Sequence, residues 1–380
     1  MINTNRLAAT FKHLVEIDSI SKEEAGVSNA IIKAMEPFDA RIFIDNAGEK
    51  TGGNTGNLII KIKGEKQVPP LLISAHMDTV EPGRGIKAVL KNGLFTSKGK
   101  TVLGADDKSA IAIIIETINV LKENNLPHGP LELLFTVCEE IGLSGAKHLD
   151  YDLITARFGY VLDSTEIGGI ATRAPAANRL KFVIHGKDAH AGAFPERGIN
   201  AICLASRAIE GLKTGRIDHE TTCNIGMING GVATNIVPGK VTVQGETRSH
   251  NQEKLDGVTN HIVDAFKSVV ENEKKLSADT LLPKIDITVE NDFPFTNIPD
   301  DHIVVKLVMQ AGRNLGKKIT ARKTGGGSDA NIFYKNGIIT GVLGTGMRDV
   351  HTLRESIRVD DMTDAAMLLI EIIKLHSKGD

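Results

Sequence analysis

Four apolar segments that read as β-strands lead, directly or through a short loop, into histidine or acidic residues. The segments are PLLISA, LELLFTVC, FGYVL and GIITGVLG, and the residues that follow them are His76, Asp78, Glu139, Glu140, Asp163 and His351. In an open parallel sheet, ligands collect where the strands end, because the loops converge at that edge. The pattern therefore predicts a parallel sheet with one functional site, built from residues far apart in the sequence.

Helical segments alternate with these strands. GADDKSAIAIIIETINVLKE begins a helix near Asp107 that is apolar on most sides and therefore buried between other elements, with Asp106 just before it. An amphipathic helix opens the chain around Leu7–Val15, and Ser21–Glu24 fits a capping box for a second helix. Strands alternating with helices indicate the α/β class, with a doubly wound, mostly parallel sheet and helices on both faces.

The pattern changes after about Arg173. Strands and helices then follow in the order β-α-β-β-α-β, from RLKFVIHG to KIDITVEN, which is typical of a ferredoxin-like α+β fold. The alternating pattern returns with the helix DHIVVKLVMQAGRNLG. We therefore expect a catalytic domain formed by residues 1–175 and 292–380, with a smaller domain inserted at residues 176–291.

Composition argues against several classes of partner. The chain has 380 residues, which are too many for one ordinary core. Its formal net charge is −2, tryptophan is absent and aromatic residues make up 4% of the chain. None of this favours nucleic acid or a membrane as a partner. The three cysteines form no CxxC pair, and Lys12 and Glu16 interrupt the first apolar stretch, unlike a signal peptide. We expect a cytoplasmic protein.

A group of carboxylates buried at one sheet edge is unstable by itself, since the charges repel one another and lose hydration, at a cost of several kcal/mol. Three carboxylates and two neutral imidazoles leave a negative charge that two zinc ions and one bridging hydroxide would neutralise. These ligand types suit zinc, with cobalt and manganese as alternatives. A further carboxylate must stay free of metal to move a proton. Spacing alone leaves open whether Asp106 or Asp107 is a ligand, and whether Glu139 or Glu140 is the base.

The motifs SAHMDTV, LGADDKS, CEEIGLSGAKHLD and YVLDS, together with the late His351, resemble those of the co-catalytic zinc hydrolases. This superfamily includes peptidase T, carboxypeptidase G, acetylornithine deacetylase and succinyl-diaminopimelate desuccinylase, and the resemblance is closest to peptidase T-like proteins. It covers essentially the whole chain. It implies that the inserted domain is a lid through which two copies of the chain form a homodimer.

The resemblance also implies a ligand set for two divalent metal ions, expected to be zinc. It makes His76, Asp106 and Asp163 the ligands of one metal and gives Asp106, Glu140 and His351 to the other, with Asp106 bridging. In the family pattern the peptide bond after the bridging aspartate is cis. Such a metal pair requires the imidazoles of His76 and His351 to lie within roughly 12 Å of each other.

Five other residues receive roles from the resemblance. Glu139 becomes the general base, and Asp78 is the carboxylate that orients a histidine ligand. In the inserted domain, His190, Asn235 and Arg248 match residues that hold the substrate's carboxylate and the tetrahedral oxyanion in family members. There the histidine often reaches across the dimer.

The function that the resemblance implies is a dinuclear zinc-dependent exopeptidase that hydrolyses short peptides by attack of a metal-bound hydroxide, most specifically a tripeptide aminopeptidase. A dipeptidase, a carboxypeptidase or an N-acyl-amino-acid deacylase would use the same metal chemistry, and no residue separates these alternatives. A second group of dinuclear aminopeptidases has a similar motif, but its extra domain enters before the bridging aspartate, and the interval from His76 to Asp106 is too short for one. A metal-free binding protein would have no evident use for Glu139. A dehydrogenase would need a GxGxxG after the first strand, which is absent.

Overall fold

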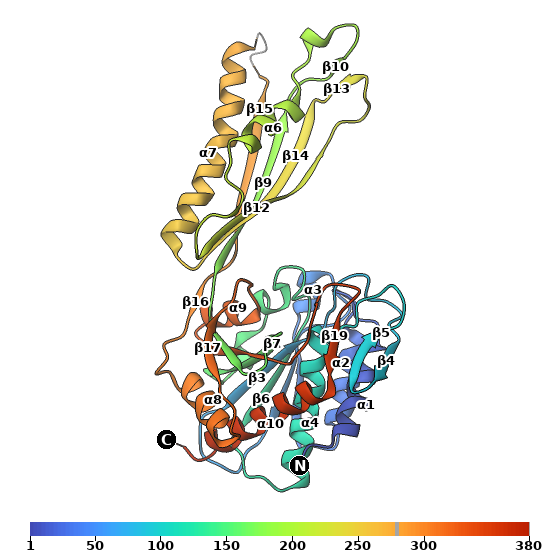
Figure 1. Cartoon of the computed structure of the whole chain (residues 1–380), viewed down its shortest axis with the longest axis vertical. Coiled ribbons are helices and arrows are strands. Elements are labelled where there is room, and N and C mark those ends of the chain that lie inside the picture. The colour runs from blue at the N-terminus through green and yellow to red at the C-terminus, as the bar shows by residue number, and fades with distance from the viewer. Residues whose placement is uncertain (278–280, 380) are drawn as a thin grey trace. The chain divides into compact units, whose positions relative to one another are not determined.

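The computed structural model describes residues 1–277 and 281–379, which form two compact units (Figure 1). Unit 1 contains Met1–Arg173, Asn297–Thr324 and the chain from Ser328 onward, and unit 2 contains Ala174–Thr296 and Gly325–Gly327. In the sequence, unit 2 is therefore an insertion within unit 1. None of the helices in the described residues is long and apolar enough to cross a membrane.

Unit 1 is built on one large sheet. In spatial order its strands are β1 (Ala40–Ile44), β2 (Leu58–Ile62), β6 (Leu131–Thr136), β3 (Leu71–His76), β7 (Phe158–Ser164), β18 (Ile339–Gly344), β8 (Gly169–Ala174) and β16 (Thr296–Asn297), with β17 (Thr320–Lys323) paired to β8. The central strands β6, β3, β7 and β18 are parallel, whereas β1, β2 and β8 pair antiparallel with their neighbours in this order. The predicted mostly parallel sheet is confirmed, with its antiparallel pairs toward the edges.

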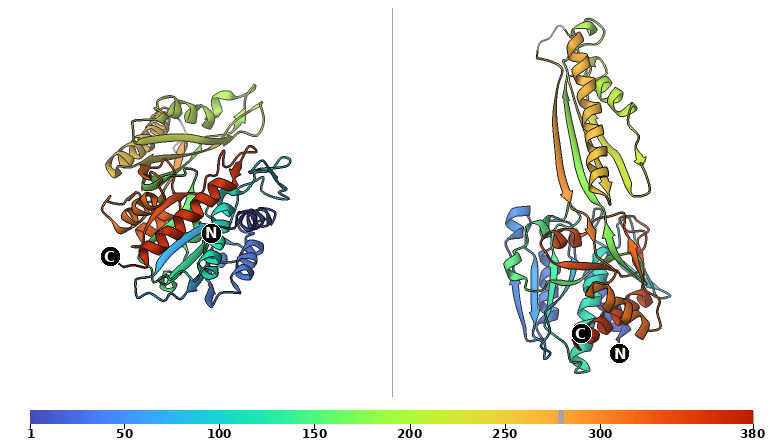
Figure 2. Two further views of the ribbon diagram at one scale, coloured as in Figure 1. Left: turned by 60° about the horizontal axis from the view of Figure 1, so that its bottom comes forward. Right: turned by 90° about the vertical axis from the view of Figure 1, so that its left-hand side faces the viewer.

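Helices cover the faces of this sheet. Every residue of β3 and β6 is buried, which requires packing on both sides of the strands. The central helix α4 (Ala105–Glu123) packs on β3 and β7, is buried along most of its length as predicted, and has α10 (Val359–His376) beside it (Figure 2). The other helices in contact with this layer are α1 (Thr4–Val15), α2 (Ala25–Met35) and α8 (Ile303–Asn314). Three short helices contact one another in sequence: α3 (Ala47–Thr51) contacts α5 (Ser144–Lys147), and α5 contacts α9 (Asp329–Lys335). α9 in turn packs on β18.

Two features of unit 1 differ from the sequence prediction. A separate three-stranded sheet of β19 (Ser356–Arg358), β5 (Leu94–Ser97) and β4 (Ala88–Lys91) has no clear signal in the sequence because its strands are only three or four residues long. The predicted capping box is wrong. α2 begins without a side-chain cap, and the Ser21 hydroxyl instead donates a hydrogen bond to Asp78 Oδ2 at 2.6 Å.

Unit 2 is a five-stranded antiparallel sheet with two helices on one face (Figure 2). The strand order is β11 (Gly215–Arg216), β12 (Thr221–Gly230), β14 (Lys240–Ser249), β9 (Ala176–His185) and β15 (Lys284–Phe293), and the helices are α6 (Ala201–Glu210) and α7 (Gln252–Leu276). In its core the rings of Phe182 and Phe266 stack with centroids 4.0 Å apart and join β9 to α7. This is the predicted ferredoxin-like order. A two-residue pairing of β10 (Ala189–His190) with β13 (Ile236–Val237) lies outside the sheet.

Candidate metal centre

The strand ends singled out by the sequence are neighbours in the sheet. His76 is the last residue of β3, Glu139 and Glu140 follow β6, Asp163 lies near the end of β7, and His351 lies in the loop after β18. Because β6, β3, β7 and β18 are adjacent and parallel, their carboxyl ends lie along one edge.

Asp106 enters the same edge from the start of α4. The main chain has non-helical dihedral angles at Asp106 and Asp107, so the regular helix starts only after them. The peptide bond between the two aspartates is cis, as the family pattern implies. Gly104, the residue before the helix, adopts a left-handed conformation with φ of 74°, which suits a residue without a side chain.

The Asp106 carboxylate contacts two imidazoles, one with each oxygen. His76 Nε2 lies 3.0 Å from Oδ1, and His351 Nε2 lies 3.1 Å from Oδ2. His351 Nε2 also lies 2.9 Å from Glu140 Oε1. Two histidines from opposite ends of the chain therefore share one carboxylate, well inside the separation that a metal pair permits. A carboxylate with one oxygen facing each imidazole has the geometry of a bridging ligand.

Asp107 is placed differently. Its Oδ2 accepts a hydrogen bond from the His76 main-chain N–H at 3.2 Å, while Oδ1 is buried without a hydrogen-bond partner among the described residues. Asp107 thus supports the main chain of one histidine, while Asp106 contacts both imidazoles. Of the two aspartates that spacing could not separate, Asp106 is the one whose geometry suits a shared ligand.

Burial disfavours the charged forms of the carboxylates in this cluster. Burial and the nearby Asp106 raise the pKa of Asp163 well above its ordinary value, and burial raises the pKa of Glu140. Hydrogen bonds to Asp106 and Glu140 raise the pKa of His351 to about 10. Burial alone would lower the pKa of His76, but its bond to Asp106 helps to raise that pKa well above the usual value. Burial thus disfavours the charged forms of Asp163 and Glu140, while the neighbouring carboxylates favour the charged forms of the two imidazoles.

The donor set fits divalent cations. Metal–ligand bonds of 2.0–2.2 Å place two ligand atoms of one metal at most about 4.4 Å apart, so a group that is a few tenths of an ångström wider needs only small side-chain movements to bind. Ligand atoms of His76, Asp106 and Glu140 lie within 4.8 Å of one another, and so do those of Asp106, Asp107 and Asp163. Two positive ions placed here would offset the cost of burying these carboxylates.

Glu139 stands apart from these contacts. It is 8% exposed, and burial, together with the charges of Asp163 and Asp329, raises its pKa well above the ordinary glutamate value. Glu140, in contrast, contacts His351. Glu140 therefore lies next to the cluster of imidazoles and carboxylates, whereas Glu139 is a buried carboxylate with a raised pKa.

Asp78 does more than the sequence indicates. Its Oδ1 lies 3.4 Å from His76 Nδ1, but that nitrogen is closer to the main-chain oxygen of Asp78, at 3.0 Å. The Asp78 carboxylate instead accepts the main-chain N–H groups of Glu139 at 2.9 Å and Glu140 at 3.1 Å. Asp78 therefore fixes the turn that carries both glutamates.

Three buried carboxylates near the centre were missed by sequence reasoning. They are Glu24, Asp329 and Glu355. Glu24 accepts the Cys138 N–H at 3.0 Å, and Asp329 accepts the Thr136 hydroxyl hydrogen bond at 2.5 Å. Burial raises the pKa of Asp329 to about 6. The run TGGGSD predicts a glycine-rich turn that lets a substrate main chain approach, or else an ordinary turn, and neither reading singles out Asp329 at its end.

The three predicted lid residues do not come together in unit 2. The main-chain N–H groups of Gly192 and Ala193 both donate to His190 Nδ1, which leaves the proton on Nε2 facing away from this turn. Asn235 is close to His190, since its main-chain oxygen accepts the Ala191 N–H at 2.9 Å. Arg248 lies toward the other end of β14, paired with Glu246 at 3.0 Å. At ~3.4 Å per residue, the length of β14 puts Arg248 roughly 25 Å from the His190 end.

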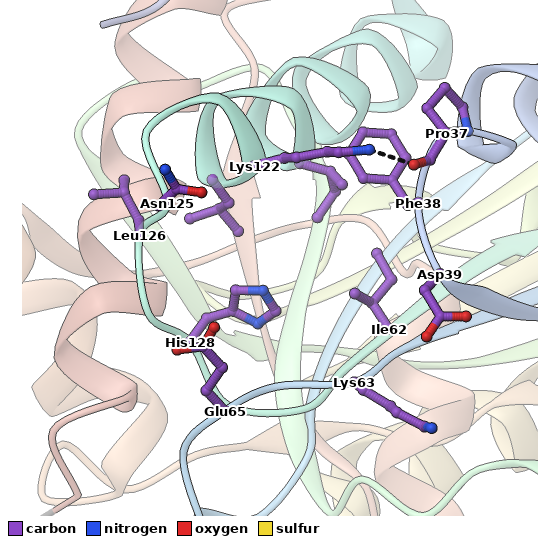
Figure 3. Close-up of a pocket in the computed structure, with 12 residues that line it drawn as sticks. Pro37, Phe38, Asp39, Ile62, Lys63, Glu65, Lys122, Asn125, Leu126 and His128 are labelled. Atoms are coloured by element: carbon purple, nitrogen blue, oxygen red, sulfur yellow. Dashed lines mark hydrogen bonds between the residues drawn. The ribbon is translucent and has the colours of Figure 1, made fainter.

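A separate pocket of about 430 Å³ lies in unit 1 (Figure 3). Phe38, Ile62 and Lys122 are among its lining residues, and Lys122 lies 4.9 Å from the centre of the Phe38 ring while its Nζ donates to Pro37 O. Ile62 pairs with the first residue of β6, whereas the candidate ligands follow the last one. Along α4, Lys122 is roughly 24 Å from Asp106 at 1.5 Å per residue. This pocket is therefore at the opposite edge of the sheet from the metal centre.

Comparisons with known proteins also point to a peptidase. A family model described as a peptidase dimerisation domain matches residues 171–274, and one described as peptidase family M28 matches residues 57–179. The M28 match ends where unit 2 begins, and in this chain unit 2 is inserted after Asp163 rather than before Asp106.

Three proteins match over the full length. The aminopeptidase PepT of Bacillus cereus is 39% identical, with 99% of each chain covered and a TM-score of 0.87. A tripeptidase of Staphylococcus aureus is 36% identical, with 100% of each chain covered and a TM-score of 0.91. The protein YqjE of Bacillus subtilis is 38% identical over 379 residues, with 100% of each chain covered. The protein is a peptidase, and the chain belongs to the peptidase T-like family of metallopeptidases.

Proposed function

We propose that this metallopeptidase is a dinuclear zinc exopeptidase that removes the N-terminal residue from tripeptides. The observation that carries the proposal is the Asp106 carboxylate, which contacts His76 with one oxygen and His351 with the other. Full-length similarity to an aminopeptidase and to a tripeptidase supports the substrate class.

In this proposal His76, Asp106 and Asp163 hold one cation, and Asp106, Glu140 and His351 hold the other. Zinc suits these ligands best, and cobalt or manganese would also fit them. When bound, the two cations supply Lewis acidity to the scissile carbonyl and to a water molecule.

Glu139 moves the proton. Its raised pKa suits a group that takes a proton from the attacking water and delivers it to the leaving amine nitrogen. Asp78 holds the main chain of Glu139 through a 2.9 Å hydrogen bond, so the carboxylate approaches the reacting atoms from a fixed turn. The Nε2–H of His190 faces away from its own turn and is suited to the oxyanion, while Asn235 and Arg248 can bind the substrate's polar groups.

Replacing the base tests the mechanism directly. Glu139→Gln keeps the size of the side chain but removes the proton acceptor, so we expect kcat for a tripeptide to fall by about 10²- to 10⁴-fold. The variant should still bind two metal ions, as measured by atomic emission spectroscopy, because Glu139 is not a proposed ligand. Glu140→Gln is the matched control and should lose metal. A near-normal kcat in Glu139→Gln would contradict the mechanism.

The substrate class needs a separate test, because a dipeptidase, a carboxypeptidase or an N-acyl-amino-acid deacylase would use the same centre. A panel of dipeptides, free tripeptides and N-acetylated tripeptides, digested with the zinc-loaded enzyme and read by mass spectrometry, separates them. An aminopeptidase releases the first residue of free tripeptides. Cleavage confined to the N-acetylated compounds would refute that specificity.

We further propose that the protein acts as a homodimer through unit 2. β12 is paired with β14 on one side, but on the other side the described residues of β11 cover only Thr222 and Cys223. Farther along β12, Met227 and Ile228 are 53% and 49% exposed. An open strand edge with exposed apolar side chains can pair with the same edge of a second copy.

A further inference from the structure

Glu355 is a buried carboxylate in the segment that carries His351. Its side chain is 2% exposed. Oε2 accepts hydrogen bonds from the main-chain N–H groups of Leu103 at 2.7 Å and Gly104 at 2.8 Å, and Oε1 accepts one from the Asp106 N–H at 3.0 Å. One carboxylate therefore receives three main-chain donors from the loop that leads into α4.

These bonds connect two parts of the metal centre that are 249 positions apart in the sequence. Glu355 follows His351 by one turn of loop, closed by a hydrogen bond from its own N–H to Thr352 O at 3.1 Å. Its side chain then holds the main chain of Asp106, whose carboxylate contacts that same histidine at 3.1 Å. The Glu355 side chain thus links the main chain of Asp106 to the loop that carries His351.

The chemistry of this contact is specific to a carboxylate. A buried negative charge is stable only if hydrogen bonds or cations replace its hydration. The three N–H donors replace part of that hydration for Glu355, and no salt bridge to it occurs within the described residues. In return, the loop gains acceptors for N–H groups that no helix or strand satisfies.

We propose that Glu355 is a positioning residue for the dinuclear centre, which fixes the main chain of Asp106 so that both its oxygens are presented to the metals. The inference rests on the metal site of the proposed function but does not depend on the substrate. Glu355 does not contact the metals or the substrate, and it acts through Asp106.

The test uses an isosteric change. In Glu355→Gln only one acceptor oxygen remains. If that oxygen faces the two N–H groups of Leu103 and Gly104, the amide nitrogen points at the Asp106 N–H, and two donors oppose each other. The variant should therefore disturb Asp106 in particular while keeping the packing of the side chain.

Glu132→Gln is the matched control. Glu132 is also 2% exposed, and it accepts main-chain N–H groups from Thr155 and Ala156, each at 2.9 Å. It lies near the start of β6, whereas the candidate ligands follow the end of that strand. Both substitutions remove a buried carboxylate that holds a loop, but only one loop carries a proposed ligand.

The measurement is the affinity of the metal-free protein for Zn²⁺, titrated in competition with a chromophoric chelator, together with the visible spectrum of the Co²⁺-loaded protein. We expect Glu355→Gln to weaken binding by about tenfold or more, as removal of residues that support ligands commonly does, and to change the Co²⁺ spectrum. Glu132→Gln should lower the thermal stability but leave affinity and spectrum unchanged.

His351→Ala separates the two hypotheses. If His351→Ala weakens metal binding and Glu355→Gln behaves like Glu132→Gln, the positioning role is wrong while the metal centre stands. If His351→Ala binds two Zn²⁺ ions like the unaltered protein, the metal centre itself is wrong. Should Glu355→Gln fail to fold, hydrogen exchange of the unaltered metal-free protein decides: the amides of residues 103–106 should exchange slowly, and exchange as fast as in exposed loops would overturn the proposal.

Discussion

At the scale of single residues, the centre depends on carboxylates that accept main-chain hydrogen bonds. Asp78 holds Glu139 and Glu140, Asp107 holds His76, and Glu355 holds Asp106. Each proposed ligand or base in this set is thus supported by a carboxylate at least 31 positions away in the chain. Side chain to main chain bonds follow no fixed sequence spacing, so sequence reasoning could place Asp78 at a strand end but not find the main-chain groups that it holds, and it could not find Glu355.

A buried histidine remote from the centre gives stability a pH dependence. His376, on α10, is 6% exposed and packs edge-on to Phe158 with ring centroids 5.6 Å apart. Burial lowers the pKa of His376 below its ordinary value of 6.5. The unfolded chain therefore binds more protons than the folded protein as the pH falls through 6.5, and the folded protein loses stability there.

We expect His376→Leu to remove this contribution, since leucine does not titrate. The free energy of unfolding of the unaltered protein should fall more steeply than that of the variant between pH 7 and pH 5. Urea unfolding of both proteins at pH 5, 6 and 7 measures the difference. A constant gap across this range would show that His376 is not responsible for any pH dependence.

At the scale of elements, the sequence predicts the long segments and misses the short ones. The four strands that lead to the candidate ligands, the buried α4 and the order of unit 2 all carry clear apolar periodicity, and the structure contains them. β4, β5 and β19 have too few residues to show a period. The capping box failed for a different reason, because Ser21 makes a tertiary hydrogen bond to Asp78 in place of a local one. A contact between distant segments therefore decided the second outcome.

The core of unit 2 allows a test of its independence from the metal centre. Phe266 is fully buried and stacks on Phe182. Phe266→Ala should destabilise unit 2 by about 3–5 kcal/mol through loss of buried surface and creation of a cavity. Metal content should not change, because His76, Asp106, Glu140, Asp163 and His351 all belong to unit 1. Thermal unfolding and atomic emission spectroscopy of the variant measure the two effects, and loss of metal would contradict this separation.

At the scale of the whole molecule, the separation of His190 from Arg248 bears on how many chains form one substrate site. The two residues lie toward opposite ends of β14 in unit 2, and one unit cannot bring both to one small peptide. We therefore expect His190 of one copy and Arg248 of the other to serve the same site in the proposed dimer. The family resemblance implies a histidine that reaches across the dimer, but the separation itself follows from the strand register, which the sequence alone does not show.

Complementation between two inactive variants tests this arrangement. His190→Ala and Arg248→Ala should each lose activity alone. When the two are co-expressed, half of the dimers are mixed, and one of the two sites in each mixed dimer has both residues intact. Activity should then return to about a quarter of the normal value. Size-exclusion chromatography with light scattering confirms the dimer, and no recovery in a verified mixed dimer would show that both residues act within one chain.

The two histidines of the centre differ in their access to water. The side chain of His76 is 2% exposed, whereas that of His351 is 48% exposed. In the proposed centre, the ion beside His351 would exchange with the medium far faster than the ion beside His76. A chelator added to the loaded enzyme would then remove the ion beside His351 first, and activity should be lost in step with that one ion.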